Sequence, residues 1–308
     1  MQMREVLAAC FDEMMTADPN VVVLDADLAK ADGTSKLHLA HPDQAFDVGI
    51  AEQNMASVAA GMASYGMKPY ITSFSPFATR RLMDQLTISV AYSHQNVKVV
   101  GTDPGITAEV NGGTHMGLED IGCLRSIAGI VIFEPSDPMQ LQQAMPQINA
   151  YDGCLYIRLF RKELPVIHDQ DYRFDLFKAD VLREGSDVTL FVSGFLTADA
   201  LQAAAKLAEE GIRAEVVEVH TIKPVDVDTV RASVAKTGCA VTIENHNIVG
   251  GFHAAILESI ASRPVPVVPI GVKDRFGEVG KLPYLRQVMG MTLEDILQAA
   301  REAVALKG

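Results

Sequence analysis

This sequence of 308 residues lacks the features that mark several classes of protein. It has no tryptophan and only four cysteines, none of them in a C-x-x-C pair or at ligand spacing from a histidine. We therefore expect reduced thiols, and neither a zinc site nor a disulfide framework. Lysine and arginine number 26 against 39 aspartates and glutamates, so the chain lacks the basic surface that nucleic-acid binding requires.

Long apolar runs are also missing. The richest stretch, residues 56–65, is made of small residues and is far shorter than the roughly 18 apolar residues of a membrane span. Residues 1–15 carry acids among their apolar positions, which is typical of an amphipathic helix and not of a signal peptide. We expect no membrane contact and a cytoplasmic location.

Short apolar segments of strand length alternate with helical patterns along most of the chain. In the first half, strands are predicted at 21–29, 46–50, 68–74, 97–102, 129–135 and 154–160, and helices at 1–18, 51–66, 77–93 and 139–150. In the second half, strands are predicted at 187–193, 214–224, 239–244 and 265–272, and helices at 197–210, 226–236 and 251–262. This alternation predicts an α/β fold built on parallel sheets that are covered on both faces.

A polar, aromatic and poorly periodic stretch interrupts this alternation. It begins at residue 166 and marks a linker, because neither a strand nor a helix pattern continues through it. We therefore expect a first α/β domain at 1–165, a linker at 166–180 and a smaller α/β domain at 181–308.

One carboxylate stands at the start of an alanine-rich helix. Glu52 follows a predicted strand, and a purely structural role is an open alternative because the helix dipole favours an acid there by ~0.3–1 kcal/mol. The small residues of the same helix allow another helix to approach closely, which favours a packed subunit interface. These residues are Ala56, Ala59, Ala60 and Ala63.

Aromatic and histidine residues follow in two further segments. Phe74 and Phe77 lie one helical turn apart, a spacing that alone is more typical of a core than of a cofactor site. His115 lies in a glycine-bearing loop, and a lone loop histidine is usually a surface residue. The glycines and the helix start after it nevertheless favour a defined position for this side chain.

Together these segments resemble the transketolase family along almost the whole chain. The motifs that carry the resemblance are DADLA (25–29), FDVGIAEQN (46–54), TSFSPF (72–77), NGGTHMGLEDIGCLRSI (111–127), EPSDP (134–138), TIKPVD (221–226), IENHNIVGG (243–251) and DRFGEVG (274–280). The resemblance implies a pyrimidine-binding domain followed by the family's C-terminal domain. It also implies thiamine diphosphate as the cofactor and transfer of a two-carbon ketol unit between sugars or sugar phosphates.

The resemblance assigns roles to individual residues. Glu52 matches the acid that pairs with the far ring nitrogen of the aminopyrimidine, and an apolar pocket would suit it because desolvation raises a carboxyl pKa. Phe77 would stack on the pyrimidine, and Phe74 would line the same pocket. Leu28 would approach the cofactor. His115 matches the histidine that hydrogen-bonds substrate oxygens.

The family's magnesium–diphosphate motif, Gly-Asp-Gly followed by Asn, is missing. The nearest strings, ADGT at 31–34 and YDGC at 151–154, lack the first glycine. We therefore expect no cofactor metal site in this chain. Mg²⁺ or Ca²⁺ would be held mainly by an N-terminal transketolase subunit, in an α2β2 heterotetramer where Asp27 bridges toward the partner. The length, about half that of a one-piece transketolase, agrees with this expectation.

The resemblance also maps the mouth of the substrate site. Asn111 replaces an aspartate that contacts the substrate, and Arg161 matches a phosphate-binding arginine, with Arg158 close by in sequence. Asp103 and Ala31 stand where the family has a histidine and a serine. A cation beside a new carboxylate binds phosphate weakly, so we expect a substrate outside the standard pentose phosphates or one bound with poor affinity.

Other interpretations remain open at this point. The β chain of a 2-oxo acid dehydrogenase E1 has the same two domains but usually a different histidine loop. 1-Deoxyxylulose-phosphate synthase shares the AEQ stretch but is one long chain. A nicotinamide dehydrogenase would need G-x-G-x-x-G after the first strand, which is absent. A non-catalytic interaction module would leave the combination of Glu52, Phe77 and His115 unexplained.

Overall fold

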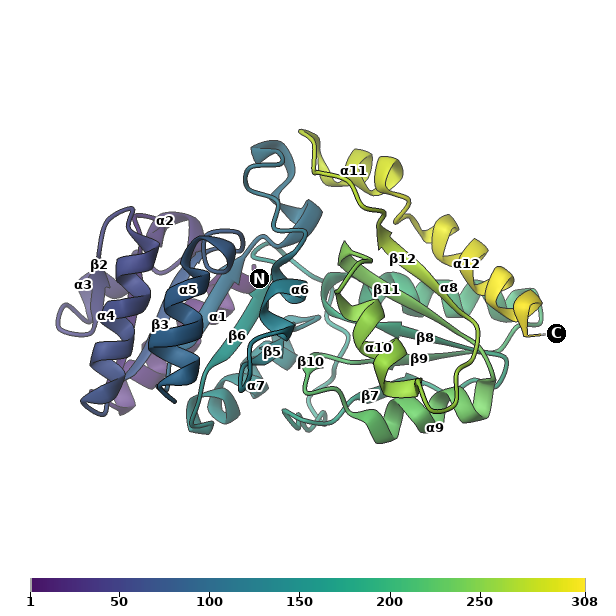
Figure 1. Cartoon of the computed structure of the whole chain (residues 1–308), viewed down its shortest axis with the longest axis horizontal. Helices are drawn as coiled ribbons and strands as arrows, with labels where there is room; N and C mark the ends of the chain where they lie inside the picture. The colour runs from purple at the N-terminus through teal and green to yellow at the C-terminus, as the bar shows by residue number, and fades with distance from the viewer. Residues whose placement is uncertain (1, 308) are drawn as a thin grey trace.

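A computed structural model describes residues 2–307 as two lobes, each built on its own sheet (Figure 1). The first sheet has seven strands in the order β10-β5-β6-β4-β3-β1-β2, all parallel except β10. Its strands are β1 (Val21–Asp25), β2 (Ala45–Asp47), β3 (Lys68–Phe74), β4 (Lys98–Thr102), β5 (Val131–Phe133), β6 (Leu155–Leu159) and β10 (Thr221–Lys223). Most of these strands are buried end to end, as expected for a parallel sheet with both faces covered.

Helices surround this first sheet. They are α1 (Met3–Ala17), α2 (Ala29–Asp32), α3 (Leu37–Ala40), α4 (Glu52–Ser64), η1 (Arg80–Leu82), α5 (Met83–Gln85), η2 (Leu86–Tyr92), η3 (Gly105–Asn111), α6 (Asp120–Arg125) and α7 (Pro138–Ala150). The helix predicted at 77–93 is thus a 3₁₀ turn, one α turn and a π segment in succession. Among the described residues, no helix is both long and apolar enough to cross a membrane.

The second lobe contains a five-stranded sheet in the order β12-β11-β8-β9-β7, parallel except for β7. Its strands are β7 (Asp180–Arg183), β8 (Val188–Val192), β9 (Ala214–Glu218), β11 (Ala240–Asn247) and β12 (Val267–Val272). Its helices are η4 (Gly194–Leu196), α8 (Thr197–Glu209), α9 (Val227–Thr237), α10 (Phe252–Ile260), α11 (Leu282–Met289) and α12 (Leu293–Leu306). The predicted α/β class with two mostly parallel sheets is confirmed.

One strand crosses between the lobes. The single strand predicted at 214–224 is wrong, because the chain leaves the second sheet after Glu218 and pairs antiparallel with β5 as β10. The carbonyl of His220 accepts a hydrogen bond from the Glu134 amide at this crossing. A continuous β pattern cannot reveal such a change of partner, because both segments are extended and apolar.

The alanine face of α4 is already covered by its own chain. Ala56 and Ala59 have no exposed surface, Ala60 is 7% exposed, and Ala63 packs against the same core. The expectation that these alanines form a subunit interface is therefore wrong. Their small size instead lets α4 lie close against β3.

A buried ionic network joins the lobes. The guanidinium of Arg158 on β6 donates to Asp120 at 2.8 Å, to Glu134 at 2.5 Å and to the carbonyl of Asn245 at 2.6 Å. Ser193 of the second lobe donates to the other oxygen of Glu134. Arg158 is fully buried, so it is a structural residue and cannot accompany Arg161 at a substrate mouth.

Candidate functional site

Three rings predicted to belong to one site lie together. Phe74 ends β3, Phe77 follows in the next turn, and His115 reaches them from the loop after η3. The His115 ring centroid lies 5.1 Å from that of Phe77 and 5.8 Å from that of Phe74, both edge-on. Residues far apart in the sequence thus form one aromatic corner at the carboxyl ends of the parallel strands, where α/β sheets commonly bind ligands.

Glu52 lies beside this corner, at the first position of α4. Its side chain is only 3% exposed, and its Oε1 accepts a hydrogen bond from Arg81 at 2.6 Å. The guanidinium carbon of Arg81 also lies 3.8 Å from the centroid of the Phe77 ring. The sequence led us to expect apolar surroundings for Glu52. The structure instead places a cation there, Arg81, whose side chain is 43% exposed.

The loop that carries His115 is held in place from several sides. Nδ1 of His115 lies 2.8 Å from the hydroxyl of Thr114, and Arg80 donates to the Thr114 carbonyl at 3.2 Å. A Cβ added at Gly113 would lie 2.6 Å from the carbonyl oxygen of Gly277, so only glycine permits this contact between loops of the two lobes. Among the described residues no partner engages Nε2 of His115, which leaves that nitrogen for a ligand.

Several loops at this edge hold residues other than glycine at positive φ. These are Asp27 (φ 60°), Asp103 (φ 47°), Glu109 (φ 50°) and Asp274 (φ 45°). Backbone strain of this kind tends to gather at functional sites. Asp27 is exposed, and its amide donates to Asp47, while Leu28 is half-buried at the start of α2.

The predicted substrate mouth contains an ion pair. Nε of Arg161 lies 2.6 Å from Oδ2 of Asp103, and its Nη1 donates to the carbonyl of Ala31 at 3.2 Å. Arg161 also lies over the ring of Phe74, with its guanidinium carbon 5.1 Å from the centroid. Burial raises the pKa of Asp103 to about 6 even though Arg161 lowers it. Asn111 is exposed at the end of η3.

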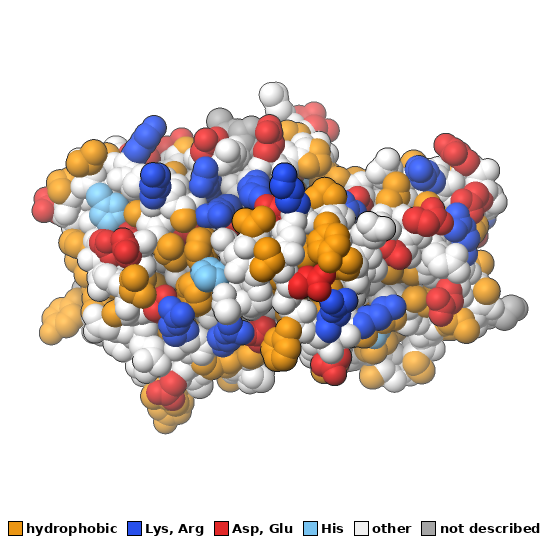
Figure 2. All heavy atoms as spheres, turned by 90° about the horizontal axis from the view of Figure 1, so that it is seen from above, with side chains coloured by type: hydrophobic (Ala, Val, Ile, Leu, Met, Phe, Trp, Pro, Cys, Tyr) orange, Lys and Arg blue, Asp and Glu red, His pale blue; other side chains and the backbone are white. Residues whose placement is uncertain are grey.

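The face above this site exposes apolar side chains. In the view from above, hydrophobic side chains gather near the middle of the surface between basic and acidic ones (Figure 2). Large apolar residues in the loops around the site are strongly exposed, namely Ile50 (74%), Val110 (62%), Val249 (66%), Phe276 (92%) and Val279 (68%). Such a concentration is typical of a surface that another protein covers.

Sequence reasoning missed the two arginines that follow Phe77. Arg81 contacts both Glu52 and Phe77, and Arg80 fixes the His115 loop through Thr114 and Glu119. A signal was present, because both arginines follow Phe77 within about one helical turn. Their roles depend on the irregular η1 turn, which the sequence pattern did not reveal.

The residues present fit half of the expected cofactor. A buried carboxylate beside two phenylalanine rings suits a flat, hydrogen-bonding ring such as an aminopyrimidine. A diphosphate with its metal needs carboxylate or amide ligands for the ion. The single metal-competent cluster among the described residues, at His168, Asp180 and Glu218, does not include any of the predicted site residues.

Comparison with known proteins identifies two domains in this chain. Residues 1–166 match the model of the transketolase pyrimidine-binding domain, and residues 177–296 match that of the transketolase C-terminal domain. A 6-deoxy-6-sulfo-D-fructose transketolase subunit from Clostridium sp. strain MSTE9 is 48% identical over 96% of this chain and 92% of its own length. An apulose-4-phosphate transketolase subunit from Phocaeicola vulgatus is 32% identical over 95% of this chain and 94% of its own length.

A solved structure is similar over its full length. It is described as a split-gene transketolase in an inactive β4 tetramer, and it superposes with a TM-score of 0.93 at 36% identity, covering 100% of both chains. Both parts of this chain thus match the corresponding parts of a split enzyme, and the family depends on thiamine diphosphate. The chain belongs to the transketolase family, as a subunit of the split type.

Proposed function

We propose that this chain supplies the pyrimidine-binding half of a thiamine-diphosphate site in a two-chain transketolase. The observation that carries the proposal is the meeting of Glu52, Phe77 and His115 in one corner. The 308 residues contain no Gly-Asp-Gly motif, so the diphosphate anchor lies outside them. When bound, thiamine diphosphate supplies the carbon nucleophile that accepts and releases the two-carbon ketol unit.

Glu52 is the residue that holds a proton for the cofactor. Its carboxyl group would pair with the far ring nitrogen of the aminopyrimidine and hold a proton at that position. Arg81 donates to Oε1, so this oxygen already has a partner within the chain. A ring nitrogen of the cofactor would reach Oε1 only when that ion pair loosens, and the 43% exposure of Arg81 gives its side chain room to move.

Other residues of this chain orient the two bound molecules. Phe77 and Phe74 line the pyrimidine pocket, and Leu28 closes its side. His115 donates through Nε2 to substrate oxygens while Thr114 fixes its ring. Asn111 contacts the substrate near the carbon–carbon bond that breaks.

A partner chain completes the site. It is an N-terminal transketolase subunit with Gly-Asp-Gly and Asn, it holds Mg²⁺ or Ca²⁺, and the assembly is α2β2. The exposed apolar residues around the site loops support a covered face, and Asp27 lies at its edge. The domain division at 1–165, 166–180 and 181–308 belongs to the same proposal, with both domains facing the partner.

The substrate is a ketose whose far end carries a weakly charged anion. Arg161 is paired with Asp103, so the mouth offers little free positive charge for a phosphate, which carries about −1.5 to −2 at neutral pH. A sulfonate carries a single charge and is satisfied more easily. The relative at 48% identity is named for a sulfonated fructose, which supports this substrate class.

Reconstitution tests the proposal. The chain is mixed with its cognate Gly-Asp-Gly subunit, thiamine diphosphate and Mg²⁺, and ketol transfer to an aldose acceptor is followed with a sulfonated ketose and with xylulose 5-phosphate as donors. We expect turnover only with both chains, and a lower KM for the sulfonated donor. Decarboxylation of 2-oxo acids would favour an E1 β chain, and no turnover with any donor would favour an interaction module. Sub-millimolar KM values for xylulose 5-phosphate with ribose 5-phosphate would contradict the substrate class.

A further inference from the structure

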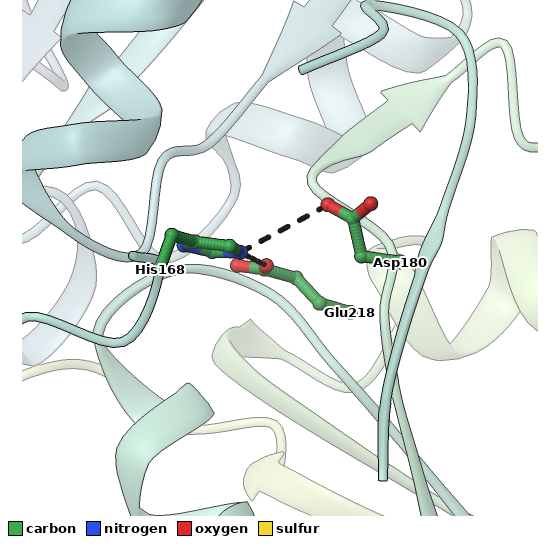
Figure 3. A group of neighbouring side chains, drawn as sticks. All are labelled: His168, Asp180 and Glu218. Carbon is green, nitrogen blue, oxygen red and sulfur yellow. Dashed lines mark ion pairs between the residues drawn. The ribbon is translucent and has the colours of Figure 1, made fainter. Parts of the chain in front are cut away.

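A second cluster of ionisable side chains lies where the linker meets the second sheet. His168 comes from the linker, Asp180 from β7 and Glu218 from the end of β9, and their side chains point toward one another (Figure 3). Nε2 of His168 lies 3.2 Å from Oε2 of Glu218 and 4.0 Å from Oδ2 of Asp180. All three ligand-type atoms lie within 4.8 Å of one another.

The histidines in this cluster have unsatisfied ring nitrogens. His168 is 5% exposed and His220 is fully buried, yet neither nitrogen of His168 nor Nε2 of His220 has an aligned hydrogen-bond partner. Nε2 of His220 faces the same oxygen of Asp180 at 3.6 Å. Buried polar atoms are rarely left without an aligned partner, and these nitrogens face carboxylate oxygens at 3.2–3.6 Å, so the cluster has donor atoms available for a ligand.

Negative charge in the cluster is not balanced by basic residues. Asp137, Asp180 and Glu218 lie within ion-pair distance of histidines, and none of them forms an ion pair with a lysine or arginine among residues 2–307. Asp137 and Glu218 have fully buried side chains. A buried carboxylate is costly unless a cation or several hydrogen bonds offset its charge. Three backbone amides donate to Asp137, so the carboxylate of the cluster that most needs a cation is Glu218.

Neighbouring side chains already orient the carboxylates. Tyr172 donates to Oδ2 of Asp180 at 2.6 Å, and Gln140 donates to Oε2 of Glu218 at 3.0 Å. Nδ1 of His168 faces Asp137 at 3.3 Å, the arrangement that usually fixes the tautomer of a metal-binding histidine.

We infer that His168, Asp180 and Glu218 form a structural binding site for a divalent transition-metal ion of the zinc type. Metal bonds of about 2.0–2.2 Å in a tetrahedron place neighbouring ligand atoms roughly 3.3–3.6 Å apart. The His168–Glu218 separation of 3.2 Å is near this range, whereas Asp180, at 4.0 Å from His168, would have to move inward to bind the ion. Imidazole with carboxylates suits zinc better than magnesium or calcium, which prefer oxygen ligands alone. Asp180 is 25% exposed, so an ion can reach the site from solvent and keep a water as its fourth ligand.

Such an ion would connect the linker to the second sheet. It would hold His168 against the end of β9 and the start of β7, and thereby fix the linker at one point. The competing arrangement has no metal and a protonated His168 between Asp137 and Glu218. Burial lowers the pKa of His168, but these two carboxylates raise it to about 10, so the two arrangements must be separated by experiment.

The test is zinc binding by the full chain after treatment with a chelator. Titration calorimetry with ZnCl₂ near pH 7.5 should give one equivalent, and Glu218→Gln and Asp180→Asn should each weaken binding at least 100-fold. His41→Gln is the matched control, because it removes a histidine outside the cluster that is likewise paired with a carboxylate, Asp12, and should leave the stoichiometry and affinity unchanged. Circular dichroism shows whether the buried variants fold.

A second measurement needs no variant. X-ray absorption at the zinc edge of the zinc-loaded wild-type chain should show at least one imidazole and otherwise oxygen ligands. The inference is overturned if the wild-type chain binds no zinc, if Glu218→Gln folds and binds it as tightly, or if the bound ion has no imidazole ligand. This test uses the chain alone, so its outcome is independent of whether the transketolase site is assembled.

Discussion

The same chemical pair, an arginine with a carboxylate, occurs in two very different settings in this chain. Arg158 and Asp120 are both fully buried, while Arg81 is 43% exposed beside a Glu52 that is 3% exposed. Arg158 is held by two carboxylates and a backbone carbonyl, whereas Arg81 has one ion pair and an aromatic ring. The Arg158 guanidinium is therefore held by several buried hydrogen bonds, whereas the Arg81 guanidinium can move away from Glu52 into solvent.

This contrast separates a structural ion pair from one that can change during function. Burial raises the pKa of Asp120, but the Arg158 guanidinium outweighs it, so the carboxyl pKa stays below its ordinary value and the Asp120–Arg158 pair remains charged. Burial raises the pKa of the second carboxyl, Glu134, above its ordinary value. Glu52 instead has a partner that reaches solvent, and a proposed catalytic acid needs such a releasable partner. Exposure of the cation, more than the presence of an ion pair, distinguishes the two roles.

The largest effect is expected from breaking the buried network. Arg158→Met leaves Asp120 as an uncompensated buried charge and Glu134 without its main hydrogen-bond donor, and removing one member of a buried pair typically costs about 3–5 kcal/mol. Urea unfolding should show that loss, or the chain should fail to fold. Arg263→Met, at an exposed position, is the control and should change stability by less than about 0.5 kcal/mol.

Glu52→Gln should affect turnover and not folding. The amide keeps the size of the side chain but cannot hold the shared proton, so turnover of the reconstituted enzyme should fall by ~10²–10⁴-fold. The unfolding midpoint should stay close to that of the wild type, and Glu13→Gln, on the exposed side of α1, should change neither quantity. Retention of more than about half the turnover would make Glu52 a helix-start carboxylate only.

Asp103→Asn should release the cation at the substrate mouth. With the carboxylate gone, Arg161 is free to bind an anion, and the KM for a sulfonated donor should fall about 10-fold, equivalent to ~1.4 kcal/mol. In the wild type the same KM should fall as pH drops through about 6, where Asp103 takes up a proton, because sulfonate charge does not change in this range. An unchanged KM in the variant and a flat wild-type pH profile would show that Arg161 does not contact the substrate's far end.

Arg81→Met should have the smallest effect. Arg81 lies over the ring of Phe77, on which the pyrimidine would stack, so the bound cofactor has to displace it. An exposed cation–π contact contributes roughly 0.5–1 kcal/mol, and without that contact to break, cofactor affinity in the assembled enzyme should rise about 2- to 5-fold. The thermal stability of the chain should fall, because Glu52 is 3% exposed and loses its cation, but by less than in Arg158→Met, where two buried carboxylates lose theirs. A weaker affinity would instead mean that Arg81 contacts the bound cofactor directly.

The sequence predicted local elements better than the contacts between them. Strand β3 was predicted residue for residue at 68–74, because its apolar run is bounded by clear turn signals. The crossing of β10, the burial of Arg158 and the Arg81–Glu52 pair all depend on which distant segments meet, and a single sequence does not encode that in its periodicity. The motifs allowed Glu52, Phe77 and His115 to be grouped through a family resemblance, and the structure brings them together.

The cluster at His168 lay outside those predictions, which placed no metal in this chain. Its members come from the linker, β7 and β9, and β7 itself was not predicted. Metal-ligand spacing is readable from a sequence only when the ligands share one or two segments. Here the side chains converge because the linker folds back on the second sheet.

The central claim is that this chain holds only half of a cofactor site. Titration calorimetry of thiamine diphosphate with Mg²⁺ tests it directly, first on the chain alone and then on the chain mixed with its Gly-Asp-Gly partner. We expect weak or no binding by the chain alone, and Mg²⁺-dependent binding with two sites per α2β2 assembly. Micromolar, Mg²⁺-dependent binding by the isolated chain would contradict it.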